Sequence, residues 1–232
     1  MSVDEDLVVY RSGLQHRLLN GVLRLRGRSV PEVASDAERQ LAGVPWRWWI
    51  GPDSDTGVAE ALRDRGYHRN GAMPVMAVRL DQLPEPSLSA PAGLVIEHVD
   101  GPEGIADYVD GYASSFGVGA GLRDAVVAAE SGLRTDLGRL IRLVGRIDGR
   151  PVATSAVLIS NGIAGLYWIG TDPSLRARGI GTALTAAAMQ VARSEQALVC
   201  TLQASDMGAP VYRRLGFTQV SEVELYSPPA GL

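Results

Sequence analysis

The chain has 232 residues, 46% hydrophobic and 21% charged, so it has the composition of a folded protein and enough length for a proper core. Its net charge of −4 argues against a general nucleic-acid binder, because no strongly basic surface is implied. All 22 basic residues are arginine, which excludes a P-loop lysine, a Schiff-base lysine and a Ser-Lys dyad.

The single cysteine, Cys200, excludes an intrachain disulfide and a cysteine-based zinc cluster, and we expect no metal site. Its apolar neighbours favour a buried strand and an inert thiol. The acidic N-terminus does not resemble a signal peptide, and no apolar run approaches the roughly 18 residues that span a bilayer. We therefore expect a cytoplasmic protein with neither a membrane nor a nucleic-acid partner.

The first part of the chain alternates strands and helices. Period-two alternation of apolar residues indicates strands, and apolar residues three and four apart indicate helices. Strands are predicted at residues 7–10, 21–26, 44–52 and 75–80, and helices between Pro31 and Gly43 and at about 58–65.

Three of the four tryptophans lie in the segment 44–52. In a strand, Trp46 and Trp48 would face one way and Trp49 the other. We interpret this segment as a wall of the core rather than as a stacking platform for a ligand.

The composition changes at residues 83–93, where proline, serine and glycine cannot easily form a helix or a sheet ladder. This segment is the best candidate for a linker, and it divides the chain into domains at 1–86 and 93–232. After it, the pattern predicts a strand, two helices, three strands, a helix, a strand, a helix and a strand. The strands are expected at 94–99, 142–147, 152–159, 163–170, 197–203 and 217–226, and the helices at 103–115, 122–132, 180–194 and 209–215.

A strand-to-helix junction at residues 171–184 carries two arginines, Arg176 and Arg178, and two glycines, Gly179 and Gly181. The first amides of a helix lack intrahelical partners and attract anions. Glycines allow close approach of a phosphate, and the arginines add positive charge. The alternative is that this segment binds no ligand and is a simple turn with solvated arginines. A Rossmann dinucleotide site is a weaker alternative, because the third glycine of that fingerprint is missing near Leu184.

Two separated motifs resemble those of the GNAT superfamily of acyl-CoA-dependent N-acyltransferases. The first is the pyrophosphate loop Arg-x-x-Gly-x-Gly at residues 176–181, and the second is Tyr-x-x-x-Gly-Phe at residues 212–217. The resemblance covers roughly residues 93 to 228. It implies an α/β fold with a mixed sheet, the GNAT acyl-CoA N-acyltransferase fold, and acetyl-CoA as co-substrate.

The resemblance also implies roles for individual residues. The end of the strand would pair with the pantetheine arm of CoA, and one of its amides would stabilise the thioester oxyanion. The loop would bind the pyrophosphate, and Ser205 stands where many relatives have an asparagine. The implied cofactor-binding residues are Ile169, Gly170, Thr171, Arg176, Ala177, Arg178, Gly179, Ile180, Gly181, Thr182 and Ser205.

Tyr212 matches the tyrosine that lies near the CoA sulfur in the family, where a phenol can protonate the departing thiolate. Its alternative role is packing at a helix–strand contact. The strand at 165–170 has no carboxylate where a general base often stands, so the base is unassigned. His98, Asp110 and Glu130 are candidates by residue type only. A substrate amine of low pKa, or a water chain that removes its proton, would need no dedicated base.

The N-terminal part resembles a degenerate partial copy of the same domain. Residues 62–67 align with residues 212–217, but Leu62 stands in place of the tyrosine and no Gly-x-Gly loop precedes the first helix. Chance similarity of helix-Gly-aromatic segments is the alternative. A half-copy exposes an apolar sheet face, so it should pack on the other domain or on a partner chain, for instance in a homodimer.

The resemblance therefore implies an enzyme that transfers an acetyl group from acetyl-CoA to a primary amine of a small-molecule or peptide acceptor by direct attack. The alternative is a non-catalytic acyl-CoA-binding sensor or regulatory protein.

Overall fold

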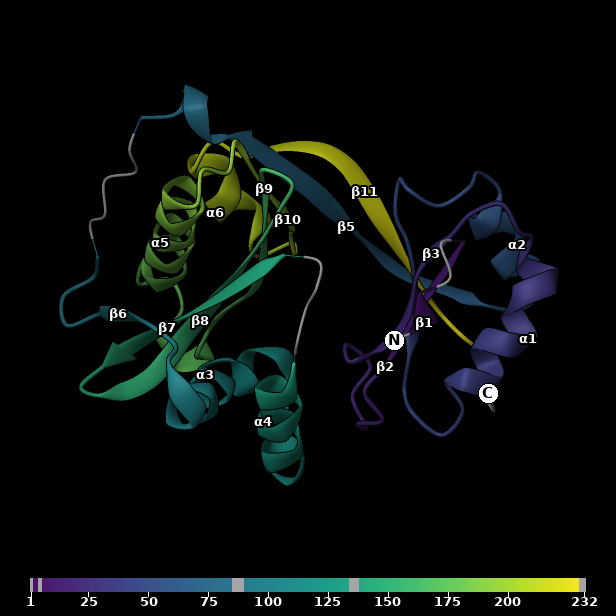
Figure 1. Cartoon of the computed structure of the whole chain (residues 1–232), viewed down its shortest axis with the longest axis horizontal. Helices are drawn as coiled ribbons and strands as arrows, with labels where there is room; N and C mark the ends of the chain where they lie inside the picture. Colours follow the sequence, from purple (N-terminus) through teal and green to yellow (C-terminus); the bar gives the residue numbers. More distant parts are fainter. Residues whose placement is uncertain (1, 4–5, 85–89, 134–137, 230–232) are drawn as a thin grey trace. The chain divides into compact units, whose positions relative to one another are not determined.

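A computed structural model describes residues 2–3, 6–84, 90–133 and 138–229 (Figure 1). The chain forms two compact units: unit 1 is Met1–Val75 with Val220–Leu232, and unit 2 is Met76–Gln219. Both divisions fall inside strands, β5 (His68–Arg79) and β11 (Thr218–Ser227). The segment expected as a linker lies partly outside the described residues, at 85–89.

Unit 1 is a small sheet with two helices. Its strands follow the order β1-β2-β3-β4-β11, in which β3 and β4 are parallel and the other described pairs are antiparallel. The elements not yet bounded are β1 (Ser2–Val3), β2 (Leu7–Arg11), β3 (Asn20–Leu25), α1 (Val30–Gln40), β4 (Arg47–Ile50) and α2 (Val58–Asp64).

Trp46 and Trp48 form a wall of the core of unit 1, and Trp49 faces the other way, as predicted. Trp46 and Trp48 are buried, and both meet the ring of Tyr67 edge-on at a centroid distance of 6.0 Å. Trp49 faces away from this cluster and donates a hydrogen bond of 3.0 Å to the Tyr10 hydroxyl. Apolar burial and edge-to-face packing thus hold the sheet against its helices.

Unit 2 is a larger mixed sheet covered by helices, with strand order β5-β10-β9-β8-β7-β6. Strands β9 and β10 are parallel, and β6 to β9 form an antiparallel series. Its remaining elements are η1 (Leu80–Gln82), β6 (Val95–His98), α3 (Gly101–Phe116), η2 (Ala120–Leu122), α4 (Arg123–Gly132), β7 (Arg139–Ile147), β8 (Arg150–Ser160), β9 (Ile163–Thr171), η3 (Pro173–Leu175), α5 (Ile180–Ser194), β10 (Val199–Gln203) and α6 (Ala209–Arg214).

The two long helices of unit 2 cover opposite faces of its sheet (Figure 1). Neighbouring residues of β8 show this: Thr154 approaches Gly111 of α3, whereas Ser155 donates a 3.4 Å hydrogen bond to the Leu184 carbonyl of α5. Successive side chains of a strand point to opposite faces. Strand β9 is therefore enclosed between α3 and α5.

The predicted order of elements is confirmed over the described residues, with differences at strand ends. β4 is shorter than the predicted 44–52, because Pro45 cannot donate to a ladder. β5 begins at His68 rather than at 75, since Gly71 and Pro74 interrupt the alternation that marks a strand. The two-residue β1 was not predicted.

The helix-to-strand turn after α2 has the same geometry as the turn after α6. The Tyr67 amide donates to the Leu62 carbonyl at 2.9 Å, and the Phe217 amide donates to the Tyr212 carbonyl at 3.0 Å. The glycine before each aromatic residue is left-handed, with φ of 86° at Gly66 and 92° at Gly216. Each unit thus carries the same glycine-dependent turn.

Replacement of either turn glycine by alanine should destabilise the protein, because a side chain disfavours left-handed φ. We expect Gly66→Ala and Gly216→Ala each to lower the free energy of unfolding by about 1–2 kcal/mol in urea titrations. Gly216→Ala should cost more, since its Cβ would lie 3.1 Å from Leu83 Cδ2. An unchanged unfolding free energy in both variants would contradict this account of the turns.

Candidate active site

Strand β9 separates from β10 partway along its length. Their parallel ladder has three residue pairs and ends at Gly165 and Thr201. Beyond that point, among the described strands, β9 pairs with β8 alone, as far as Thr171. The edge of β9 from about residue 166 to 171 is thus open on the β10 side, where an extended ligand can form main-chain hydrogen bonds.

The open half of β9 contains a β-bulge. Tyr167 pairs with Ala156 and Gly170 with Thr154, so two residues of β9, Trp168 and Ile169, lie opposite one residue of β8. Trp168 has a left-handed backbone with φ of 50°. A bulge adds one residue to a strand and changes the direction of the groups that follow it. The sequence did not reveal this feature.

The chain turns sharply after β9. The Asp172 carboxylate accepts hydrogen bonds from the Ser174 amide at 2.9 Å and the Ser174 hydroxyl at 2.7 Å, and these bonds lower the pKa of Asp172. Arg176 Nε donates to the Thr171 carbonyl at 3.3 Å, which ties the loop to the end of the strand. The predicted residues Thr171 and Arg176 are thus in contact.

Two left-handed residues lead into α5: Ala177 with φ of 60° and Gly179 with φ of 81°. Gly179 is the N-cap, without a side-chain capping bond, and the first turn of α5 has no acidic residue. The amides of Ile180, Gly181 and Thr182 lie in that first turn, where a helix leaves its donors without intrahelical partners. The geometry of this end of α5 is compatible with an anion, and the anion site stays a prediction.

Gly181 has room for a side chain within the protein. A Cβ there would lie 3.5 Å from Thr171 Oγ1, which is an ordinary contact. Internal packing therefore does not require glycine at this position. A ligand that approaches the backbone closely would require it.

Tyr212 lies on α6 in a buried position. Its ring meets Phe217 edge-on at 6.0 Å and packs so closely on Gly208 that a Cβ there would lie 2.8 Å from Tyr212 Cε2. Burial raises the pKa of the Tyr212 phenol to about 12. The group therefore keeps its proton at neutral pH and can donate it.

Ser205 lies just before α6 and interacts with the start of this helix. Its hydroxyl accepts a 3.1 Å hydrogen bond from the Gly208 amide, and its carbonyl accepts the amides of Gly208 and Ala209. Ser205 and Tyr212 thus both lie against Gly208. The junction residues share a core with Tyr212, because Ile180 and Tyr212 belong to one hydrophobic cluster against which Ile169 packs.

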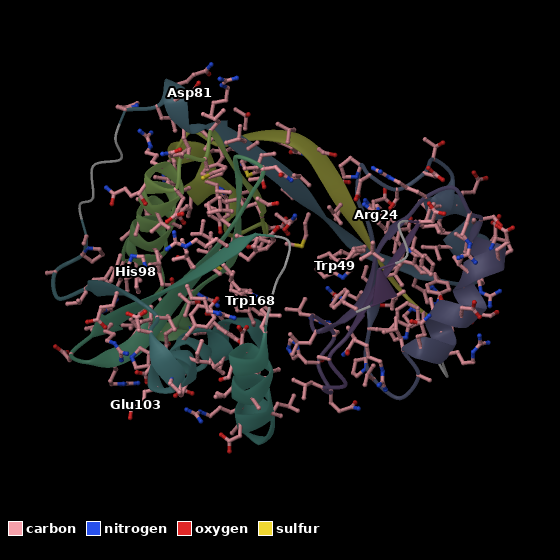
Figure 2. All side chains as sticks on the ribbon, viewed as in Figure 1. Arg24, Trp49, Asp81, His98, Glu103 and Trp168 are labelled. Carbon is pink, nitrogen blue, oxygen red and sulfur yellow. The ribbon has the colours of Figure 1, made fainter. Side chains whose placement is uncertain are left out.

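The three candidate bases lie on other elements. His98 is exposed on the edge strand β6 (Figure 2). Asp110 accepts both Arg123 Nε and Nη2, at 2.6 and 2.8 Å. Glu130 accepts both Arg142 Nε and Nη2, at 3.0 and 2.7 Å. The two carboxylates are therefore held in ion pairs, and the base stays unassigned.

Sequence reasoning missed the residues of unit 2 that surround the bulge. Trp168 stacks on Tyr112 of α3, and Thr154 donates a 2.7 Å hydrogen bond to the Trp168 carbonyl. One sequence pattern pointed there: Tyr108, Tyr112 and Phe116 recur every four residues and so share one face of α3. No local sequence pattern indicated which residues this face of α3 contacts.

Unit 2 thus combines an open strand edge, a helix N-terminus free of acidic residues and a buried phenol. Residues 139–219 match the family described as acetyltransferase (GNAT) domain, so the chain contains a GNAT acetyltransferase domain. No curated protein sequence matches the chain.

Solved structures show the same fold over most of the chain. A GCN5-related N-acetyltransferase from Kribbella flavida is 23% identical, with a TM-score of 0.71, over 94% of this chain and 84% of that one. A GCN5-related N-acetyltransferase from Sphaerobacter thermophilus is 19% identical, with a TM-score of 0.67, over 95% and 75%. A tandem GNAT protein from the clavulanic acid biosynthesis pathway is 17% identical, with a TM-score of 0.65, over 92% and 75%.

The described residues contain no group of three or more His, Cys, Asp or Glu residues that could hold a metal ion. No helix among them is long and apolar enough to cross a membrane.

Cys200 should be unreactive in the folded protein. Its thiol is buried in β10, and burial raises the pKa of Cys200 to about 12. Because the thiolate is the nucleophile, alkylation by iodoacetamide at mildly alkaline pH should be on the order of 10³ times slower than for an exposed thiol. Mass spectrometry should detect rapid modification only after urea unfolding. Rapid alkylation of the folded protein would contradict the buried position.

Proposed function

We propose that the protein transfers an acetyl group from acetyl-CoA to a primary amine of an acceptor by direct attack. The observation that supports this most strongly is the course of β9, whose open and bulged half leads through a left-handed turn into the N-terminus of α5. An extended thioester arm fits the open edge, and a pyrophosphate fits the helix end. The acceptor is a small molecule or a peptide, and the reaction uses no metal and no nucleic-acid partner.

The cofactor residues divide into two groups in this proposal. Ile169, Gly170 and Thr171 would bind the pantetheine arm, and an amide at the bulge would donate to the oxygen of the tetrahedral intermediate. Residues 176–182 would bind the pyrophosphate through backbone amides and the side chains of Arg176 and Arg178. Ser205, just before α6, would add a polar contact to CoA that is weaker than that of the loop.

In the chemical step, the amine nitrogen forms a bond to the carbonyl carbon and the carbon–sulfur bond breaks. The electron pair of that bond goes to sulfur, and Tyr212 donates a proton to the leaving thiolate. The attacking amine loses its proton to solvent. No side chain is acylated, which agrees with the burial of Cys200.

We also propose that residues 1–86 are a degenerate partial copy of the catalytic domain, which spans 93–232. The shared turn geometry at Gly66 and Gly216 supports this, as does the parallel pairing of β3 with β4 and of β9 with β10. A fold likeness to a tandem GNAT protein points the same way. The copy carries no Gly-x-Gly loop, so CoA should bind unit 2. A homodimer would be one way to cover the apolar sheet face of the N-terminal copy. We also propose that the protein is cytoplasmic.

A sensor of acyl-CoA is the second candidate function. The arrangement that favours it is the pairing of Asp110 with Arg123 and of Glu130 with Arg142, which leaves neither carboxylate free as a base. Such a protein would bind CoA without turnover. Thiol release from acetyl-CoA with a broad panel of amines separates the two functions. Amine-dependent release supports the transferase, and tight CoA binding without release supports the sensor.

Substitution of Gly181 should separate ligand binding from stability. We expect Gly181→Ala to keep the unfolding free energy, because its Cβ has room and alanine is a better helix former by up to about 1 kcal/mol. The same variant should bind CoA at least about tenfold more weakly in calorimetry, since the methyl group would meet the pyrophosphate. Unchanged CoA affinity would contradict the assignment of this loop. Gly132→Ala, in helix α4, is the control for glycine substitution away from the loop, because its Cβ would meet nothing within 4 Å and its φ is not positive.

Substitution of Tyr212 should lower turnover and leave binding intact. We expect Tyr212→Phe to reduce kcat by about 10²-fold with little change in KM for acetyl-CoA, because it removes a proton donor and keeps the ring. Burial raises the Tyr212 pKa to about 12, so wild-type kcat should not fall through loss of this proton below about pH 11. A phenol with its ordinary pKa of about 10 would lose activity from about pH 9. Full activity of Tyr212→Phe would exclude Tyr212 as the acid.

A further inference from the structure

The face of α3 that packs on the sheet lies against the bulge of β9. Its residues Gly111, Tyr112, Ser115 and Phe116 contact Thr154, Trp168, Gly170 and Thr171. Figure 2 labels Trp168 where β9 passes this helix. We call these residues of α3, together with Thr154, the α3 clamp.

The bulge needs such support because of the residue at its centre. Trp168 is a large residue with a left-handed backbone, φ 50°, a conformation that costs free energy and persists only where the surroundings enforce it. Its ring stacks on Tyr112 at 4.8 Å with an interplanar angle of 26°. Phe116 meets the same ring edge-on at 4.8 Å. Two rings of α3 therefore hold the indole.

The backbone of the bulge is held as well. Thr154 is fully buried, and its hydroxyl donates a 2.7 Å hydrogen bond to the Trp168 carbonyl. Gly111 permits this arrangement, because a Cβ at Gly111 would lie 2.9 Å from Thr154 Cγ2. Further along, the Ser115 hydroxyl donates a 2.7 Å hydrogen bond to the Thr171 carbonyl. Both ends of the segment 168–171 are thus fixed by side-chain hydroxyls.

A second layer supports Tyr112. Its hydroxyl lies 3.5 Å from Glu130 Oε1, and Glu130 is paired with Arg142 in a nearly buried ion pair. The Arg142 guanidinium carbon in turn lies 5.8 Å from the centre of the Tyr108 ring. Helix α4 and strand β7 therefore hold the aromatic face of α3 in place. This accounts for the role of Glu130 without assigning it proton transfer.

A one-residue change of register turns every following side chain of a strand to the other face and every following amide to the other edge. If the bulge relaxed into regular strand, Ile169, Gly170 and Thr171 would reverse their directions. The amides proposed to bind the thioester would then point away from it. The state of Trp168 thus decides the direction of the groups at the proposed reaction centre.

We propose that the α3 clamp is a positioning device for acetyl transfer, in which Tyr112, Phe116, Ser115 and Thr154 keep the bulge at Trp168 and so direct the following amides at the thioester oxygen. This inference rests on the proposed transferase function. The residues of the clamp are positioning residues, because they act through the backbone of β9.

The first test removes one hydroxyl of the clamp. The assay uses the amine that wild-type protein acetylates fastest. Thr154→Val should lower kcat at least about tenfold and change the Kd for CoA less than about threefold, because the lost hydrogen bond affects stabilisation of the transition state and not CoA binding. Amide hydrogen exchange of residues 168–172 should accelerate about tenfold. Ser160→Ala is the control: it removes a hydroxyl at the far end of the same strand, where Ser160 pairs with Ile163 away from the bulge, and it should leave these rates within about twofold.

The second test varies the stacked ring. Tyr112→Leu should show the same fall in kcat and the same faster exchange, whereas Tyr112→Phe keeps the stack and should restore both to near wild-type values. A purely structural role would lower the melting temperature of Tyr112→Leu without changing kcat of the remaining folded protein. That result would overturn the proposal, as would unchanged exchange at 168–172 in both Thr154→Val and Tyr112→Leu. If wild-type protein releases no thiol with any amine, the proposed function fails, and the exchange measurement alone decides whether the clamp holds the bulge.

Discussion

One extra residue in β9 sets the geometry on which the rest of unit 2 depends. Because of this extra residue, Trp168 and Ile169 together lie opposite a single residue of β8. The bulge lies in the half of β9 that no longer pairs with β10. The strand then runs into a left-handed turn and the first-turn amides of α5, which lack intrahelical partners. Strand edge, turn and helix end therefore form a continuous row of main-chain donors and acceptors. Such a row suits an extended ligand with a thioester at one end and a pyrophosphate at the other.

The sequence predicted the parts of this arrangement that depend on local patterns. Gly179 and Gly181 stood out because a turn and a close backbone approach need glycine, and Tyr212 stood out by its spacing from Gly216 and Phe217. The burial of Trp46 and Trp48 followed from the alternation of a strand. Each of these features involves residues that are close together in the sequence, so local sequence patterns were sufficient to predict it.

The parts that could not be predicted depend on contacts between distant segments. Thr154 binds the carbonyl of Trp168, and Ser115 binds that of Thr171, across gaps that no periodicity encodes. The bulge itself has no sequence mark, because Trp168 is an unfavourable residue for a left-handed backbone. The pairing of Glu130 with Arg142 likewise turned a candidate base into a structural ion pair. In each case the tertiary structure, and not the local sequence, decides the role of the residue.

The central claim is that the junction of unit 2, and not its counterpart before α1 in unit 1, receives the CoA pyrophosphate. Amide NMR spectra of the labelled protein, recorded while acetyl-CoA is added, test this most directly. The account predicts that the largest shifts occur at residues 169–171 and 176–182, with little change in the loop at residues 26–29. Shifts confined to the loop before α1, or no saturable shift at the N-terminus of α5, would contradict it.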